Sequence, residues 1–258
     1  MKKICYILFI TLFTSALYSQ EKKHVFKEGE WLRYKMSYSG FLKAGNATLS
    51  VKKDSLNNKE VFHVTGRGWT TGIIKLFFKV EDDYQSYIDI DTKKPYLFKR
   101  KINEGGYKIH RHTQFNYQNN TAYVQDFKHQ TDSIVPIGNI QDMLSSFYYL
   151  RNYDVSNMKP GEEISLDMFI DYKTFPFKLR FLGTEIIKTR FGKIKTLRFR
   201  PMVQAGRVFK ENESVTIWIS ADQNKIPIRM KASLAVGSLK AELDAFKGLA
   251  NSFQIIFD

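Results

Sequence analysis

The chain has 258 residues, of which 43% are hydrophobic and 15% are aromatic, and it contains one cysteine. The length is sufficient for one large hydrophobic core or two small ones, and a single cysteine excludes a framework of internal disulfides. The formal net charge of +14 favours attraction to anionic surfaces or acidic ligands, although charges dispersed along a chain are also typical of solvated strand faces.

Residues 1–19 have the pattern of a secretory signal peptide. Two lysines precede an almost wholly apolar run over residues 4–17, and small residues lead to a cleavage site near Ser19-Gln20. The run is shorter than the roughly 20 residues that span a bilayer, so a retained membrane anchor is the less favoured interpretation. Cys5 lies inside the run and cannot be the lipidated first residue of a lipoprotein. We therefore expect a diffusible exported protein without cysteine and without a nucleic-acid partner.

Apolar and polar residues alternate with a period of two along much of the remaining chain. This alternation predicts half-buried antiparallel strands, and it covers residues 31–38, 47–51, 107–117, 177–181 and 215–219. Arg111 falls out of the pattern in its segment. Breaks at Asn57-Asn58, Gly105-Gly106, Asn119-Asn120 and residues 191–193 are typical of hairpin turns.

A short and very apolar helix is predicted over residues 70–79, with Thr70 or Thr71 as its cap. Packing into the core is the favoured interpretation of this segment, and a plug over a hydrophobic cavity is the functional alternative. The apolar side chains concerned are Trp69, Ile73, Ile74, Leu76, Phe77 and Phe78.

A second helix is predicted over residues 139–151, near the middle of the chain. Asn139 is the expected cap, and Met143, Phe147 and Leu150 would then share one face.

The segments on either side of this second helix resemble each other. Residues 27–32 have an echo in 159–164, and residues 87–95 have one in 218–227. Turn residues recur in any β protein, so chance similarity is the alternative to duplication. We predict a mainly β fold in one domain over residues 20–258. Its strongly curved antiparallel sheet or half-open barrel would consist of two similar meander halves, near 26–130 and 158–250, with one or two short helices.

Three stretches carry a family resemblance: residues 26–34 leading to 45–49; the run Gln-Asp-Met-Leu-Ser-Ser-Phe-Tyr-Tyr-Leu-Arg at 141–151; and 218–222 followed by 226–229 and 236–243. Together they resemble the exported bacterial family catalogued as domain-of-unknown-function 3108. The resemblance covers nearly all of the chain after residue 19, and the central run is its most specific part. It implies a periplasmic protein of Gram-negative bacteria and no catalytic residues. By analogy of fold alone, it also implies a half-open barrel like that of periplasmic lipoprotein carriers.

The sequence contains no constellation that indicates catalysis, a metal site or a cofactor. His110 and His112 are two apart and would face the same side of a strand, but the cationic surroundings disfavour a metal ion. Asp82 and Asp83 are adjacent, so their side chains point to opposite faces of a strand. A nucleophile elbow and a glycine-rich phosphate loop are both absent.

Basic residues gather around one predicted hairpin. Lys193, Lys195 and Arg198 are candidates for contact with an anionic lipid surface, but lysines on an edge strand also prevent aggregation between sheets. The second interpretation is slightly favoured.

The leading functional hypothesis is a non-catalytic binding or carrier module for a lipid or another hydrophobic ligand. Its apolar cavity would lie between the curved sheet and the two helices. The alternative is a structural or interaction protein of the cell envelope that docks a partner through its sheet edges or the basic hairpin. The oligomeric state does not follow from the sequence. The expected ligand contacts are Trp69, Ile73, Ile74, Phe77, Phe78, Met143 and Phe147.

Overall fold

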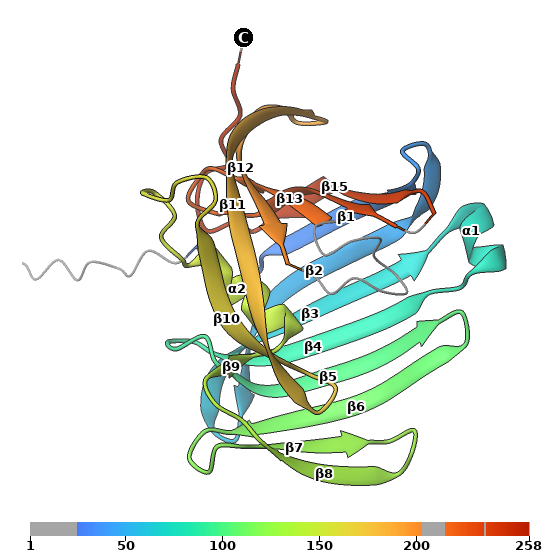
Figure 1. Cartoon of the computed structure of the whole chain (residues 1–258), viewed down its shortest axis with the longest axis vertical. Helices are drawn as coiled ribbons and strands as arrows, with labels where there is room; N and C mark the ends of the chain where they lie inside the picture. The colour runs from blue at the N-terminus through green and yellow to red at the C-terminus, as the bar shows by residue number, and fades with distance from the viewer. Residues whose placement is uncertain (1–24, 203–214, 235, 258) are drawn as a thin grey trace, which may run out of the picture.

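The computed structural model describes residues 25–202, 215–234 and 236–257 (Figure 1). The predicted signal peptide at residues 1–19 lies outside the described residues. Within the described ranges, neither helix has the length and hydrophobicity needed to cross a bilayer.

The described residues contain fifteen strands, which form a single curved sheet (Figure 1). The strands of the first half are β1 (Trp31–Tyr38), β2 (Leu42–Leu56), β3 (Lys59–Thr70), β4 (Glu81–Asp89), β5 (Pro95–Glu104), β6 (Tyr107–Asn116), β7 (Thr121–Asp126) and β8 (Thr131–Pro136). Those that follow are β9 (Ile140–Gln141), β10 (Glu163–Ile170), β11 (Lys173–Thr189), β12 (Gly192–Pro201), β13 (Val215–Ser220), β14 (Pro227–Ser233) and β15 (Ser238–Lys247). The two helices of the described residues are α1 (Gly72–Phe77) and α2 (Met143–Arg151).

The strand order confirms the predicted mainly β fold, a strongly curved antiparallel sheet or half-open barrel. Strands β1 to β8 pair in sequence, β10 to β15 do the same, and β15 pairs with β1 to join the two runs. All these pairings are antiparallel, whereas β9 runs parallel to β10. The end strands β8 and β9 are not paired with each other, so the barrel is open between them.

The two runs of strands follow the predicted halves, and duplication of one half into the other stays a prediction. The turn before β1 and the turn before β10 each have a glycine with positive φ, at Gly29 (85°) and Gly161 (98°). The turns before β5 and β14 each have a lysine with positive φ, at Lys93 (61°) and Lys225 (46°). Equivalent places in the two runs therefore have the same unusual backbone.

The predicted hairpin turns are confirmed. Asn57 and Asn58 lie between β2 and β3 with φ of 51° and 61°, as a two-residue type I′ turn requires. Gly105 and Gly106 lie between β5 and β6, also with positive φ. Both turns use residues that tolerate the left-handed region.

Alternation of side chains gives the sheet an apolar concave face, on which α2 lies (Figure 1). Val64, Phe98 and Val124 of the first half are buried on this face and pack in one cluster with Leu144 and Tyr148 of α2. The helix contacts β3, β4, β9 and β10. The core of the first half is therefore a sheet wrapped around one helix.

The start of α2 differs from the prediction. Asp142, and not Asn139, is the N-cap: its Oδ1 accepts hydrogen bonds from the backbone N–H groups of Leu144 and Ser145, both at 2.8 Å. The Ser145 hydroxyl accepts from the Asp142 N–H, which completes a capping box. The helix begins later than predicted because residues 140–141 form β9.

The predicted apolar face of α2 is also only part of its buried surface. Met143, Phe147 and Leu150 are half-buried, whereas Leu144, Ser145, Ser146, Tyr148 and Arg151 are buried. The curved sheet surrounds the helix, so several faces are covered and a single-face pattern describes it poorly.

A fully buried ion pair fixes the C-terminal end of α2. Arg151 donates to both carboxylate oxygens of Glu30 at 2.6 and 2.8 Å, and both side chains are about 2% exposed or less. The same guanidinium donates to the backbone carbonyls of Val25 and Asn224. Arg151 thereby joins the chain before β1, the end of α2 and the turn before β14.

Removal of one partner of this pair is expected to destabilise the folded protein strongly. Glu30→Ala would leave the Arg151 charge buried and uncompensated, and we expect the free energy of unfolding to fall by about 3–5 kcal/mol. Denaturant unfolding measures the loss, with the exposed neighbour Glu28→Ala as the matched control. The double variant Glu30→Met, Arg151→Met should recover much of the stability, and equal losses in the single and double variants would contradict this account.

The buried cap of α2 should make stability depend on pH. Burial raises the pKa of Asp142 to about 6, although hydrogen bonds from Ser145, Ser86 and Leu144 favour the carboxylate. Between pH 4 and 6 the unfolded state releases this proton while the folded state keeps it, so stability falls as pH rises, by about 2–3 kcal/mol in all.

Asp142→Asn tests this expectation, because asparagine caps helices equally well and carries no charge. The free energy of unfolding, measured at several pH values, should contain the predicted fall between pH 4 and 6 in the unmodified protein. This contribution should be absent in Asp142→Asn. The exposed control Asp91→Asn should keep the pH dependence of the unmodified protein. If the stability of Asp142→Asn changed with pH in the same way as that of the unmodified protein, Asp142 would not be the group responsible.

Candidate functional site

The concave face of the second half carries unbroken rows of apolar side chains. The first row consists of successive cross-strand partners on β12, β13, β14, β15 and β1, which are Phe199, Ile217, Met230, Ala241 and Met36. Phe199 and Ala241 are buried, and the other three are half-buried. By alternation along β1, Met36 lies on the same face as the buried residues of that strand. The row therefore continues the core toward one open end of the barrel.

A second row lies next to the first, closer to the ends of the strands. Val215, Ala232, Leu239 and Tyr38 are its cross-strand partners, and the Tyr38 hydroxyl donates to the Val236 carbonyl at 2.8 Å. The opposite face of the same strands is charged: Lys35, Glu242 and Arg229 face each other there. The sheet is thus amphipathic, with its apolar side inward.

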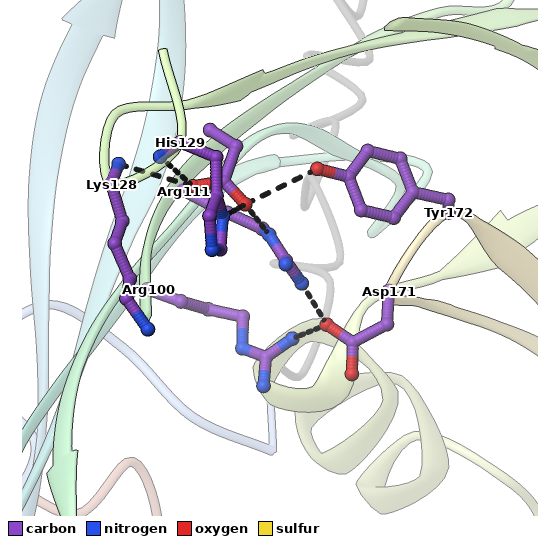
Figure 2. A network of polar contacts seen from close by, with 7 residues as sticks. Arg100, Arg111, Lys128, His129, Asp171 and Tyr172 are labelled. Carbon is purple, nitrogen blue, oxygen red and sulfur yellow. Dashed lines mark hydrogen bonds and ion pairs between the residues drawn. The ribbon is translucent and has the colours of Figure 1, made fainter. Parts of the chain in front are cut away.

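A polar network ties the β10–β11 turn to the first half (Figure 2). Arg100 of β5 and Arg111 of β6 are cross-strand partners, and each donates to Oδ1 of Asp171 at 2.6 Å. Asp171 lies in the turn after β10, and Figure 1 shows the β10–β11 hairpin crossing the sheet. We call this group, with Asp126 and Tyr172, the latch. It connects segments that share no backbone ladder.

The electrostatics of the latch favour its ionised form. Burial opposes charge on Asp126, but hydrogen bonds from His129 and Arg111 hold the pKa of Asp126 well below its usual value. Burial likewise disfavours the Arg111 charge, yet its contacts with Asp126, Tyr172 and Asp171 raise the pKa of Arg111. The Arg111 guanidinium also lies 4.8 Å from the centre of the Tyr172 ring. Asp126 and Arg111 are therefore both charged at neutral pH.

A groove of about 570 Å³ lies over the ends of β3 to β6 on the side of α1. Its lining includes Trp69, Asp82, Lys101 and His110. Burial and the nearby Glu104 raise the pKa of Asp82 to about 6, against a hydrogen bond from the Asn103 N–H. The groove combines an aromatic ring with charges of both signs.

The structure separates the predicted ligand contacts into three places. Trp69 lines the groove, Met143 and Phe147 pack against the core on α2, and the remaining residues lie on α1 or its end. The expected packing of α1 into the core is wrong: none of its residues is buried, and Phe77 is 83% exposed. The prediction of a cavity between the sheet and both helices is therefore wrong in one respect, because α1 does not form one of its walls. Ile73, Ile74, Phe77 and Phe78 lie at the end of the sheet instead (Figure 1).

The predicted basic residues are spread along β12. Lys193 lies at the turn after β11, and its backbone forms an isolated bridge with Ile256 of the C-terminal segment. Lys195 is exposed, whereas Arg198 is half-buried and donates to Glu185 at 3.3 Å. Arg198 also lines a groove of about 530 Å³ with Trp218.

The two histidines lie against an aromatic ring. The rings of His110 and His112 lie 4.7 and 4.6 Å from the ring of Phe127. Burial, with Lys99 and His110 nearby, lowers the pKa of His112 to about 4, so its imidazole is neutral at pH 7. Among the described residues, no group of three or more potential ligands could hold a metal ion.

Sequence reasoning missed the latch. One signal was available, since Arg111 interrupts the alternation of its strand, and a charge on an otherwise apolar face needs a partner. Arg100 stands in a run of basic residues and gives no such sign. Asp171 lies 71 residues from Arg100 and 60 from Arg111, so no local pattern connects them.

Residues 33–244 match the family described as "Protein of unknown function (DUF3108)". The chain belongs to this family. The match confirms the resemblance inferred from the three sequence stretches. Among curated proteins, no similar sequence was found.

Two solved structures are similar to the family member described here. A β-barrel-like protein of the domain of unknown function DUF1849 from Brucella abortus is 9% identical, with 84% of this chain and 96% of that chain covered and a TM-score of 0.55. A Bacteroides fragilis protein with a YmcC-like fold is 10% identical, with 86% and 97% covered and a TM-score of 0.36. The first shows that the two chains share a β-barrel-like fold.

Loss of the latch should loosen the hairpin more than it lowers global stability. Asp171 is half-exposed, so Asp171→Asn is expected to cost only about 1 kcal/mol. Backbone amides of the β10–β11 turn should exchange with solvent several-fold faster, because the turn loses both arginine contacts. Hydrogen exchange with mass spectrometry measures this, with Asp167→Asn on the same hairpin as control. Unchanged exchange at residues 168–176 would show that the latch holds nothing in place.

Proposed function

We propose that this protein is an exported, non-catalytic binding or carrier module that holds a lipid or another hydrophobic ligand on the concave face of its sheet. The signal-peptide pattern of residues 1–19 supports export, and a periplasmic location is part of the proposal. The ligand would be held by burial of its apolar chain and not by a covalent bond or a metal.

The observation that carries the proposal is the apolar row from β12 to β1. Ile217, Met230 and Met36 are only half-buried, although they face inward and continue a closed core. Apolar area that remains exposed to water gains about 25 cal/mol per Å² when a ligand covers it. Methionine side chains adapt to chains of different shape, which suits a carrier of lipids with variable tails.

The contact residues of this proposal differ from those expected from the sequence. The residues of α1 are replaced by inward-facing residues of β12 to β15 and β1, because the sheet supplies the concave apolar surface. Met143 and Phe147 keep a place in the proposal, since they are half-buried on α2 beside the core.

Co-purification of ligand tests the proposal directly. The full chain is expressed in a Gram-negative host, and the processed protein is purified from the periplasm and extracted with organic solvent for lipid mass spectrometry. A fluorescent fatty-acid analogue then serves as the binding probe. Met230→Glu places a charge in the row and should weaken probe binding by about tenfold or more. Met230→Gln is the milder variant should the charged one fail to fold.

Lys231→Glu is the matched control, because residue 231 is adjacent, exposed and on the opposite face. It should bind the probe as the unmodified protein does. Absence of both co-purified lipid and probe binding would overturn the proposal. Capture of an envelope protein by crosslinking, lost in Lys193→Glu, Lys195→Glu, would instead support the interaction-protein alternative.

A further inference from the structure

Exposed apolar side chains gather at one end of the sheet. Phe41 (85% exposed) lies in the β1–β2 turn, Leu76 and Phe77 (both 83%) lie on α1, and Val236 (76%) lies in the β14–β15 turn. Tyr107, at the start of β6, is 53% exposed. Single exposed apolar residues are common on protein surfaces, but a contiguous group marks a surface of interaction.

The connections that carry these residues all lie at the same end, because β14, β15 and β1 to β8 follow one another in the sheet with antiparallel pairing throughout. We define the rim as the residues of this end: 38–43, 71–80, 104–108, 127–130 and 233–238, except residue 235. Figure 1 shows α1 and the β1–β2 and β14–β15 turns on this side of the molecule.

Hydrogen bonds and ring contacts make the rim continuous. The Ser39 N–H donates to the Ser238 carbonyl at 2.7 Å, and the Thr71 N–H donates to the Ala44 carbonyl at 3.0 Å. The Gly105 N–H donates to the Lys79 carbonyl at 2.8 Å, which joins the segment after α1 to the β5–β6 turn. The Phe78 ring lies directly over Gly105, where no side chain would fit. The β1–β2, β3–β4, β5–β6 and β14–β15 connections therefore form one surface and not separate tips.

The charge of the rim is strongly positive. These residues include five lysines (Lys43, Lys75, Lys79, Lys108 and Lys128) and one carboxylate, Glu104. All five lysines are exposed. One of them, Lys79, pairs at 2.9 Å with Glu81, which lies just outside the rim. Exposed aromatic and aliphatic side chains are thus interleaved with lysines at the same end.

We propose that the rim docks the protein onto the surface of an anionic lipid bilayer. The apolar side chains of α1, Phe41 and Val236 would enter the boundary between headgroups and acyl chains, and the lysines would contact anionic headgroups. Lysine is depleted from the cores of protein–protein interfaces, so the interleaved lysines favour a lipid surface over a protein partner. This inference does not require a ligand on the concave face.

Vesicle binding tests the proposal. The processed full chain, with its N-terminus checked by mass, is sedimented with vesicles of phosphatidylcholine alone or mixed with phosphatidylglycerol. Binding is expected to the mixed vesicles and to fall steeply with added salt. Leu76→Ser, Phe77→Ser should weaken binding by about tenfold or more, because it removes the two most exposed apolar side chains of α1. Lys43→Glu, Lys75→Glu should abolish the preference for the anionic vesicles.

Matched controls separate the rim from general surface effects. Ile134→Ser, Ile186→Ser removes two residues that are 72% and 59% exposed outside the rim, and Lys52→Glu, Lys53→Glu reverses two exposed charges in the part of β2 that lies away from the rim. Both variants should bind vesicles normally, as should Met230→Glu. Loss of vesicle binding can therefore be told apart from loss of ligand binding on the concave face. Unchanged binding by Leu76→Ser, Phe77→Ser would overturn the inference. Absence of vesicle binding, with a dimer in sedimentation that this variant dissociates, would overturn it in favour of self-association.

Discussion

The buried ion pair between Glu30 and Arg151 is the contact on which the arrangement of the two halves depends. A guanidinium that is taken out of water must keep its partners, because an isolated buried charge is far more costly than a lost surface contact. Arg151 satisfies this demand with groups from two distant segments: Glu30 and the carbonyl of Val25 before β1, and the carbonyl of Asn224 before β14. The end of α2 is thereby fixed to both runs of strands at once, and the helix occupies the concave face at that position.

Because α2 is fixed at that position, the rest of the concave face is formed by side chains of the sheet. The first half covers its apolar side with the helix, whereas the second half presents rows of apolar residues that are only half-buried. The opposite face carries cross-strand charges such as Lys35 and Glu242, so the period-two alternation gives inside and outside opposite character. The apolar character then extends from the concave face to the rim. Both proposals follow from this continuity, one for the interior and one for the edge.

The elements that depend on local patterns were largely predictable. Alternation over residues 31–38 and 215–219 predicted β1 and β13, and the Asn57-Asn58 and Gly105-Gly106 pairs predicted turns that the backbone adopts. The cap of α2 was placed too early because Asn139 and Asp142 both have capping side chains, and only the pairing of β9 with β10 decides between them.

Features that depend on distant partners were not predictable in the same way. The sequence of α1 shows that its residues are apolar, but it does not show whether another part of the chain covers them. The prediction that α1 packs into the core was wrong for that reason. The interruption at Arg111 indicated an unusual position on its strand. Its partner Asp171 could not follow from the sequence, because it depends on where the β10–β11 hairpin crosses the sheet.

The pairing of β1 with β15 has a consequence for how the chain reaches its native state. Trp31 lies opposite Lys247, so closing the ladder brings together nearly the two ends of the described chain. Contacts of such long sequence separation form late, since the entropy of closing a large loop opposes them. During synthesis or translocation that starts from the N-terminus, β1 has only β2 as a neighbour until the last strand emerges. The sheet can therefore close only after its last strand has been made, and until then one edge of β1 has no strand beside it.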